Sequence, residues 1–247
     1  MKIAVMGGTG LIGSQVVTIL NGAGHEAVPY SLTNGVNLIT GEGLDTALKG
    51  AEVVVNLTNS PTFDDASPAF FRTSMDNLLA AAAREEVGHA VILSIVGVDQ
   101  VPELVYYQAK TLQEKILEAG PVPYSIVRAT QFFEFVDAVL SWTSDENTVR
   151  LPDTPVQPMA SADVSAAVAE VSMGEPLNGI RNVGGPEVFT LDELGRVALA
   201  AKGDKRTVVL DHTAGMFAAV KGDVLIAPPG AVLASTTFRE WLAARAS

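Results

Sequence analysis

The feature that most constrains the fold is a set of three spaced glycines close to the start of the chain. In KIAVMGGTGLIGSQVV an apolar stretch, residues 2–6, leads into Gly7, Gly10 and Gly13, and an apolar helical pattern follows. Glycine weakens a helix interior, so its repeated use at a helix start needs another reason. A sharp turn that a Cβ atom would obstruct supplies that reason. The pattern therefore predicts a strand, a tight turn and a helix, in that order.

Apolar runs of strand length recur along the first half of the chain and alternate with helix-like segments. The expected strands are residues 2–6, 25–30, 52–57, 90–96 and 124–129. The expected helices are residues 13–20, 73–87 and 104–119. Continuous apolar strands separated by helices are typical of a parallel sheet covered on both faces. We therefore predict an α/β fold built on a doubly wound parallel sheet.

The pattern changes after about residue 131. A proline-rich stretch, residues 151–164, precedes a helix-like segment. Two later helices are each predicted to begin with a capping box, in which a threonine and a glutamate three residues on satisfy free amides reciprocally. These boxes are Thr190 with Glu193 and Thr237 with Glu240. We predict a first domain, residues 1–131, and a smaller C-terminal part, residues 132–247, packed on it.

Composition excludes several classes of protein. Of the 247 residues 48% are hydrophobic and 18% charged, which suits a packed interior. The absence of cysteine excludes a disulfide framework and a cysteine nucleophile, and it fits a cytoplasmic location. A net charge of -12 without a basic stripe argues against a nucleic acid partner. No apolar run is long enough to span a membrane, and the three separated histidines predict no metal site.

The glycines also match the needs of a dinucleotide site. Gly7 is placed for the tight turn, Gly10 for close approach of a pyrophosphate, and Gly13 for packing of helix on strand. The free amides and the positive dipole end of the helix would face the phosphates. The alternative is that the glycines merely permit tight packing. The expected cofactor contacts in this loop are Gly7, Thr9, Gly10, Leu11, Ile12 and Gly13.

A second pattern, YYQAK, lies near the start of the helix expected at residues 104–119. Tyr106 and Lys110 are four residues apart, so they share one helix face. A lysine ammonium beside a phenol lowers the tyrosine pKa and favours acid–base work. An ordinary helix surface also has such pairs, so this pattern gains weight only together with the glycine loop.

Taken together, these motifs resemble the short-chain dehydrogenase/reductase superfamily, and within it the atypical, NmrA-like branch. The resemblance rests on GGTGLIG at residues 7–13 and on Tyr-x-x-x-Lys. LSIVGVD, PYSIVRATQFFEF, ASADVSAAVAE and NVGGPEVFTLDEL extend it over nearly the whole chain. It implies a Rossmann domain that binds NAD(P), with a smaller C-terminal substrate-binding lobe.

The resemblance further implies a reductase that passes hydride from the cofactor to a small apolar carbonyl, quinone or enone. Tyr106 would protonate the resulting oxyanion, and Lys110 would hold the ribose and tune Tyr106. Ser94 matches a family position that can bond the substrate oxygen, although a satisfied strand hydroxyl is an equal alternative. Further cofactor contacts are expected where strands end, at Thr58, Asn59 and Thr130.

One segment departs from the family pattern. PYSLTNG, residues 29–35, has Leu32 where members that use NADP(H) usually carry an arginine, and it has no acid that would bind the ribose of NAD(H). Ser31, Thr33 and Asn34 could bind a phosphate or ribose through neutral hydrogen bonds, which are weaker than charge-assisted ones. This loop does not decide between NADP(H) and NAD(H). We expect one of the two as cofactor, with NADP(H) slightly preferred.

Two other functions stay open beside the reductase. One is a redox-silent cyclase, isomerase or dehydratase, in which Tyr106 and Lys110 do acid–base work. The other is a non-catalytic sensor of nicotinamide nucleotides. The neutral loop favours both, whereas the tyrosine and lysine favour an enzyme. The expected partner is a small apolar or aromatic substrate, and a homodimer is compatible with the sequence.

Overall fold

The computed structural model describes residues 1–246, and it divides the chain into two compact units. Unit 1 comprises residues 1–128 and 164–181, and unit 2 comprises residues 129–163 and 182–247. The single boundary expected at residue 131 thus differs from the structure, because the chain returns to unit 1 after residue 163. The segment that re-enters unit 1 is a helix, residues 161–173, made largely of small residues. The spacing of its apolar residues does not show which of the two units the helix packs on.

A seven-stranded sheet has the order β11-β8-β5-β4-β3-β1-β2. The strands of the first half are β1 (Lys2–Met6), β2 (Glu26–Tyr30), β3 (Val53–Asn56), β4 (His89–Ile95) and β5 (Tyr124–Ala129). β8 (Gly179–Gly184) and β11 (Val232–Leu233) complete the order. β1 pairs in parallel with both β2 and β3, so the predicted doubly wound parallel sheet is confirmed.

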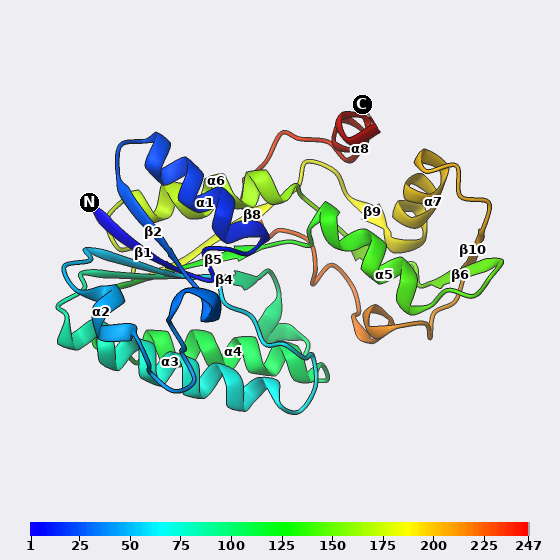
Figure 1. The fold of residues 1–247 in the computed structure, drawn as a ribbon. Coiled ribbons are helices and arrows are strands. Elements are labelled where there is room, and N and C mark those ends of the chain that lie inside the picture. Colours follow the sequence, from blue (N-terminus) through cyan, green and yellow to red (C-terminus); the bar gives the residue numbers. More distant parts are fainter. Residues whose placement is uncertain (247) are drawn as a thin grey trace. The chain divides into compact units, whose positions relative to one another are not determined.

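Helices cover both faces of the sheet within unit 1 (Figure 1). α1 (Leu11–Gly22) and α6 (Ser161–Met173) lie on one face, and the Ser165 hydroxyl bonds to the Ile12 carbonyl at 3.4 Å. α3 (Ser67–Arg84) and α4 (Val105–Glu118) lie on the other. The remaining short elements are η1 (Leu32–Asn34), α2 (Leu44–Leu48) and η2 (Val98–Gln100).

The core explains why the strands are apolar throughout. All four residues of β3 are buried, since helices cover the sheet on both sides. On the face of α3 and α4, Val54 and Ile92 pack with Leu78 and Leu117, which are at most 1% exposed. Burial of each such leucine or isoleucine contributes about 1.5–3 kcal/mol. This packing fixes the strand ends, and with them the loops that carry the polar residues described below.

Unit 2 is built from short elements. Its helices are α5 (Val136–Trp142), α7 (Leu191–Ala201) and α8 (Phe238–Ala246), with η3 (Phe133–Phe135) and η4 (Met216–Ala219). Two small sheets pair β6 (Thr148–Leu151) with β10 (Thr207–Leu210), and β7 (Pro155–Val156) with β9 (Phe189–Thr190). Both predicted capping boxes are confirmed, at Thr190 and at Thr237. Within residues 1–246, no helix combines the length and apolar character needed to cross a membrane.

Candidate functional site

The turn between β1 and α1 requires glycine at three positions, Gly7, Gly8 and Gly13. Gly7 has φ +75°, and a Cβ there would lie 2.9 Å from the backbone carbon of Leu57. A Cβ at Gly13 would lie 2.2 Å from the Gly7 carbonyl oxygen, so the first turn of α1 packs directly on the loop. The close contact at Gly8, whose Cβ would lie 2.6 Å from the Cα of Pro29, was not predicted, although the adjacent glycine pair was visible in the sequence.

Gly10 differs from these glycines because a Cβ there would make one tight contact and no severe overlap. It is the N-cap of α1 with ordinary extended angles, and a Cβ would meet only the Gly7 carbonyl oxygen, at 3.3 Å. Within the described chain, α1 has no side-chain cap and no acid in its first turn. The backbone amides at this helix start therefore remain available to an anion. Beside them Thr9 and Leu11 are exposed and Ile12 is buried.

The loop after β3 lies against the glycine turn. A Cβ at Gly7 would come within 3.1 Å of the Thr58 backbone nitrogen. Asn56, at the end of β3, accepts hydrogen bonds from the Thr58 amide at 3.0 Å and the Thr58 hydroxyl at 2.7 Å. The next residue, Asn59, is the partner of the tyrosine considered below. The predicted residues Gly7, Thr58 and Asn59 are thus brought together through the packing of β1 beside β3.

Tyr106, in the first turn of α4, is held by this loop. Its hydroxyl donates a hydrogen bond to Asn59 Oδ1 at 2.6 Å. Its ring lies between two phenylalanines, with centroids 4.7 Å from Phe63 and 6.2 Å from Phe71. Burial raises the pKa of Tyr106 to about 12. The hydroxyl therefore carries its proton throughout the physiological pH range and can act as a donor.

Lys110 is directed elsewhere than expected. Its ammonium donates to the Leu93 carbonyl at 2.7 Å and to Gln113 Oε1, and it lies 5.0 Å from the Phe71 ring centroid. The side chain is 5% exposed, and burial lowers its pKa to about 8 against the opposing effect of Glu114. The expectation that Lys110 lowers the pKa of Tyr106 is wrong for this structure, because burial dominates and raises it. Although Tyr106 and Lys110 lie on one face of α4, the Tyr106 hydroxyl and the Lys110 ammonium bond different partners.

Two further predicted polar residues, Ser94 and Thr130, are buried. Ser94, in β4, is 3% exposed, and its hydroxyl has no hydrogen-bond partner within residues 1–246. Thr130, in unit 2, is 2% exposed and donates to the Gln157 carbonyl at 2.6 Å. The Ser94 hydroxyl is therefore free to bond a ligand, whereas that of Thr130 already has a structural role.

In the uncharged loop after β2, residues 31–34, the polar side chains form hydrogen bonds within the loop. Asn34 Oδ1 accepts from the Ser31 amide at 2.5 Å, while its Nδ2 donates to the Pro29 carbonyl at 2.7 Å. The hydroxyls of Ser31 and Thr33 bond each other at 2.8 Å. The side chain of Leu32 is 74% exposed. The Asn34 amide thus bonds within the loop, where the Thr33 hydroxyl is on an exposed residue and that of the half-buried Ser31 also bonds Asn34 Oδ1 at 3.2 Å.

Buried polar groups on α4 were not predicted from the sequence. Glu114, 3% exposed, pairs with Arg128 of β5 at 2.5 Å, and Arg128 also reaches Asp99 at 3.2 Å. Gln113 is completely buried beside Lys110. A helix that buries part of its polar face breaks the usual amphipathic pattern, so periodicity alone could not find this cluster. The residues 1–246 contain no group of three or more His, Cys, Asp or Glu arranged to hold a metal.

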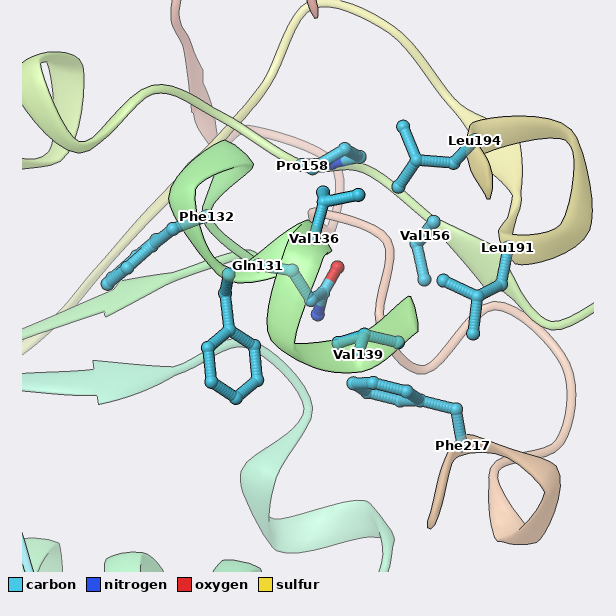
Figure 2. Close-up of a pocket in the computed structure, with 10 residues that line it drawn as sticks. Gln131, Phe132, Val136, Val139, Val156, Pro158, Leu191, Leu194 and Phe217 are labelled. Atoms are coloured by element: carbon cyan, nitrogen blue, oxygen red, sulfur yellow. The ribbon is translucent and has the colours of Figure 1, made fainter. Parts of the chain in front are cut away.

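The aromatic residues after Gln131 divide between core and cavity. Phe133 is 1% exposed and packs against Phe238, with ring centroids 5.0 Å apart. Phe132 and Phe135 instead line a small cavity of unit 2, which Gln131 also lines (Figure 2). From the sequence, each of these phenylalanines could belong to the core or line a pocket. In the structure Phe133 belongs to the core, and Phe132 and Phe135 line the cavity.

The sequence is similar to those of several known proteins. The family model described as NAD(P)H-binding matches residues 7–172. The (4-alkanoyl-5-oxo-2,5-dihydrofuran-3-yl)methyl phosphate reductase of Streptomyces griseus is 28% identical over 211 residues, which cover 77% of this chain and 70% of the relative. The photosystem II assembly factor Ycf39 of Synechocystis is 25% identical over 226 residues, which cover 78% of this chain and 67% of that protein.

Solved structures share the fold. The dTDP-4-dehydrorhamnose reductase of Bacillus anthracis, in complex with NADP, has a TM-score of 0.72 at 14% identity, covering 97% of this chain and 92% of that one. The UDP-glucose 4-epimerase of Thermus thermophilus, in complex with NAD, has a TM-score of 0.70 at 20% identity, covering 85% and 86%. At these identities the likeness is one of fold.

Proposed function

Since this chain belongs to the NAD(P)H-binding family, we propose that it is a reductase of the short-chain dehydrogenase/reductase type, which reduces a small apolar carbonyl, quinone or enone with Tyr106 as proton donor. The observation that carries the proposal is the placement of the Tyr106 hydroxyl. It is protonated, bonds Asn59 at 2.6 Å, and adjoins the loop that packs on the glycine turn.

The residues present fit a nicotinamide dinucleotide. The space at Gly10 is one that a larger side chain would fill, and the start of α1 offers its backbone amides to a pyrophosphate. Thr58 and Asn59 would border the same ligand, with Ser31 and Thr33 toward its adenosine end. When bound, the reduced nicotinamide supplies a hydride to the acceptor carbon.

Tyr106 then performs the proton transfer. As negative charge develops on the acceptor oxygen, the phenol donates its proton to that oxygen, and the phenolate is reprotonated from solvent. With a pKa of about 12, the phenol holds its proton at neutral pH, as a donor must before the transfer. The single hydroxyl proton is donated to Asn59 in the structure, so the hydroxyl turns about its C–O bond from Asn59 to the acceptor oxygen before the transfer, while Phe63 and Phe71 restrict the ring.

The Streptomyces griseus relative supports the enone within this substrate class. By its name its substrate is a methyl phosphate of a dihydrofuran that bears an alkanoyl group and a neighbouring oxo group, so that substrate also carries a charged phosphate. We therefore place a conjugated carbonyl compound first among candidate substrates for this chain.

One experiment tests the proposal directly. Purified protein would be mixed with NADPH or NADH and, in turn, 2-cyclohexenone, menadione and acetophenone, and the loss of absorbance at the nicotinamide band would be followed. Consumption that depends on both the acceptor and the enzyme is the expected result. Micromolar cofactor binding without turnover of any acceptor would instead favour a sensor.

The redox-silent alternative also has an observation in its favour. The Lys110 ammonium bonds Leu93 and Gln113 rather than lying free for a ribose, and the loop around Leu32 has no charge for a phosphate. Failure of both nucleotides to bind at millimolar concentration would make this alternative the leading one.

We expect Leu32→Arg to raise the affinity for NADPH about tenfold without changing that for NADH, because a guanidinium adds charge-assisted bonds to the 2′-phosphate. Leu32 is 74% exposed, so the larger side chain costs little stability. Calorimetric titration of both nucleotides measures the change, with Leu32→Gln as the uncharged control. An equal gain for both nucleotides, or none, would show that residue 32 does not face the phosphate.

A further inference from the structure

The carboxamide of Asn59 uses only one of its two polar ends. Its Oδ1 accepts hydrogen bonds from the Tyr106 hydroxyl at 2.6 Å and from the Ser60 backbone amide at 3.0 Å. Its Nδ2 donates no hydrogen bond to any group of residues 1–246, and Asn59 is an exposed residue. An N–H group next to the proposed proton donor is therefore open to a ligand.

The Ser60 amide fixes which end of the Asn59 carboxamide is the oxygen. Tyr106 alone would not decide this, because a hydroxyl both donates and accepts. A backbone N–H only donates, so a half-turn of the carboxamide would set the Nδ2 hydrogens against that of Ser60. The oxygen therefore faces Ser60 and Tyr106, and Nδ2 keeps its hydrogens for another acceptor.

The loop that carries Asn59 is held on both sides. Before it, Asn56 Oδ1 accepts from the amide and the hydroxyl of Thr58. After it, the Ser67 hydroxyl of α3 lies 3.1 Å from Ser60 Oγ, and both serines are at most 5% exposed. A donor that is held in place needs little rearrangement when charge develops beside it.

Tyr106 and Asn59 are close enough to donate to one atom. Asn59 Oδ1 lies 2.6 Å from the Tyr106 oxygen, and the nitrogen and oxygen of a carboxamide are about 2.3 Å apart, so Nδ2 is within about 5 Å of that oxygen. Two donors that each bond an acceptor at about 2.8 Å can be about 5.5 Å apart. A single acceptor oxygen can therefore bond both groups.

The oxyanion of the proposed reaction needs a donor other than Lys110. The Lys110 ammonium bonds the Leu93 carbonyl at 2.7 Å and Gln113 Oε1, and the side chain is 5% exposed. Negative charge that develops in a reaction is stabilised by hydrogen bonds from groups already in place. Asn59 Nδ2 is such a group, next to the hydroxyl that gives up the proton.

We propose that Asn59 is a second catalytic residue, whose Nδ2 donates a hydrogen bond to the acceptor oxygen of the substrate beside Tyr106. As the acceptor carbon gains hydride, a pair of π electrons moves onto this oxygen, and the proton of the Tyr106 hydroxyl is transferred to it. Asn59 gains and loses no atom. The inference rests on the proposed reductase function and requires an acceptor atom with two lone pairs, as a carbonyl oxygen has.

Asn59→Asp separates donation from positioning of Tyr106. The carboxylate keeps an oxygen for the Tyr106 hydroxyl and the Ser60 amide but has no N–H group, whereas Asn59→Ala removes both. With an acceptor that the protein reduces, we expect Asn59→Asp to lower kcat by about 10- to 100-fold, at least as much as Asn59→Ala. No loss in Asn59→Asp, or a loss smaller than that in Asn59→Ala, assigns Asn59 to positioning alone and overturns the proposal.

Asn37→Asp is the matched control. Asn37 Oδ1 also accepts from two backbone amides, those of Ile39 at 2.9 Å and Thr40 at 3.3 Å, so the change adds the same charge and keeps the same kind of bonds. Asn37 has no part in the proposed reaction, and we expect an unchanged kcat. An equal loss in Asn37→Asp and Asn59→Asp would be an effect of charge and would count against Asn59 as a donor.

Nuclear magnetic resonance tests the donor without turnover. The Asn59 side-chain amide signals are identified by their absence from spectra of Asn59→Asp. The probe is 4-nitrophenolate, whose charged oxygen stands for the oxyanion, and nitrobenzene, which lacks that oxygen, is the control. With NADP⁺ or NAD⁺ present, we expect 4-nitrophenolate to move the Asn59 signals and to bind Asn59→Asp about tenfold more weakly, while nitrobenzene leaves the signals in place. No movement at millimolar 4-nitrophenolate overturns the proposal.

The two proposals fail in distinguishable ways, because NADPH consumption is followed on the same samples. Movement of the Asn59 signals without reduction of any acceptor supports the Asn59 donor and rejects the reductase. Reduction with an unchanged kcat in Asn59→Asp supports the reductase and rejects the Asn59 donor.

Discussion

Replacing Tyr106 by phenylalanine lowers kcat by about 10²–10⁴-fold in the reaction we propose, while the affinity for nicotinamide nucleotide stays the same. The substitution removes the proton donor and leaves the ring between Phe63 and Phe71. General acid catalysis by a positioned side chain contributes a factor of this size. Steady-state kinetics with a reducible acceptor, together with nucleotide titration, measure both quantities.

The adjacent Tyr107 provides a matched control. It is 3% exposed, so Tyr107→Phe removes the same atom from the next residue of the same helix. We expect its kcat to stay close to that of the original protein. An undiminished kcat in Tyr106→Phe would remove Tyr106 from the mechanism, and an equal loss in both variants would point to disturbed packing of α4.

The pH profile gives a second check on Tyr106. Because burial raises its pKa to about 12, the phenol remains protonated from pH 6 to beyond pH 10. Deprotonation of Tyr106 should therefore cause no loss of kcat in this range. If kcat falls with an apparent pKa near 7 that Tyr106→Phe abolishes, the proton donor has a different environment in the working complex.

Our second prediction concerns Gly10→Val, which we expect to lower the affinity for nicotinamide nucleotides by about 100-fold or more. A Cβ at Gly10 would meet the Gly7 carbonyl oxygen at 3.3 Å, a tight contact that a backbone shift of a few tenths of an ångström relieves, so the fold of the variant is checked in the same experiment. The valine methyls would occupy the approach to the backbone amides of α1, and these amides are the proposed phosphate ligands. Calorimetric titration gives the affinity, and circular dichroism and the melting temperature report on the fold.

Substitutions at two other glycines serve as controls for this experiment. Gly22→Ala, at the far end of the same helix with no atom within 4 Å of the new Cβ, should leave binding unchanged. Gly13→Ala should destabilise the protein itself, since its Cβ would lie 2.2 Å from the Gly7 oxygen. Folded Gly10→Val that still binds NADPH and NADH normally would locate the pyrophosphate elsewhere.

Much of the sheet could be predicted because strand formation here depends on local apolar runs. β1 and β5 have the predicted bounds, and β2 begins one residue later than expected. Helix ends were less well predicted: α3 begins at Ser67 rather than residue 73, with Pro68 in its first turn. That start has polar and aromatic residues with no clear period, and contacts with the rest of unit 1 bury Ser67 and Phe71.

The sequence by itself determined the strand-turn-helix at the glycines, the order of apolar strands and helices, and the two capping boxes, because each depends on residues close together in the chain. Only the tertiary structure decided which polar ends meet. It brought Asn59 to Tyr106, 47 residues away, and turned Lys110 toward Leu93 and Gln113. It also left the Gln131 amide facing a cavity formed by segments distant in sequence. A helix or strand pattern specifies a face, whereas the partner of a buried donor depends on what folding brings within about 3 Å.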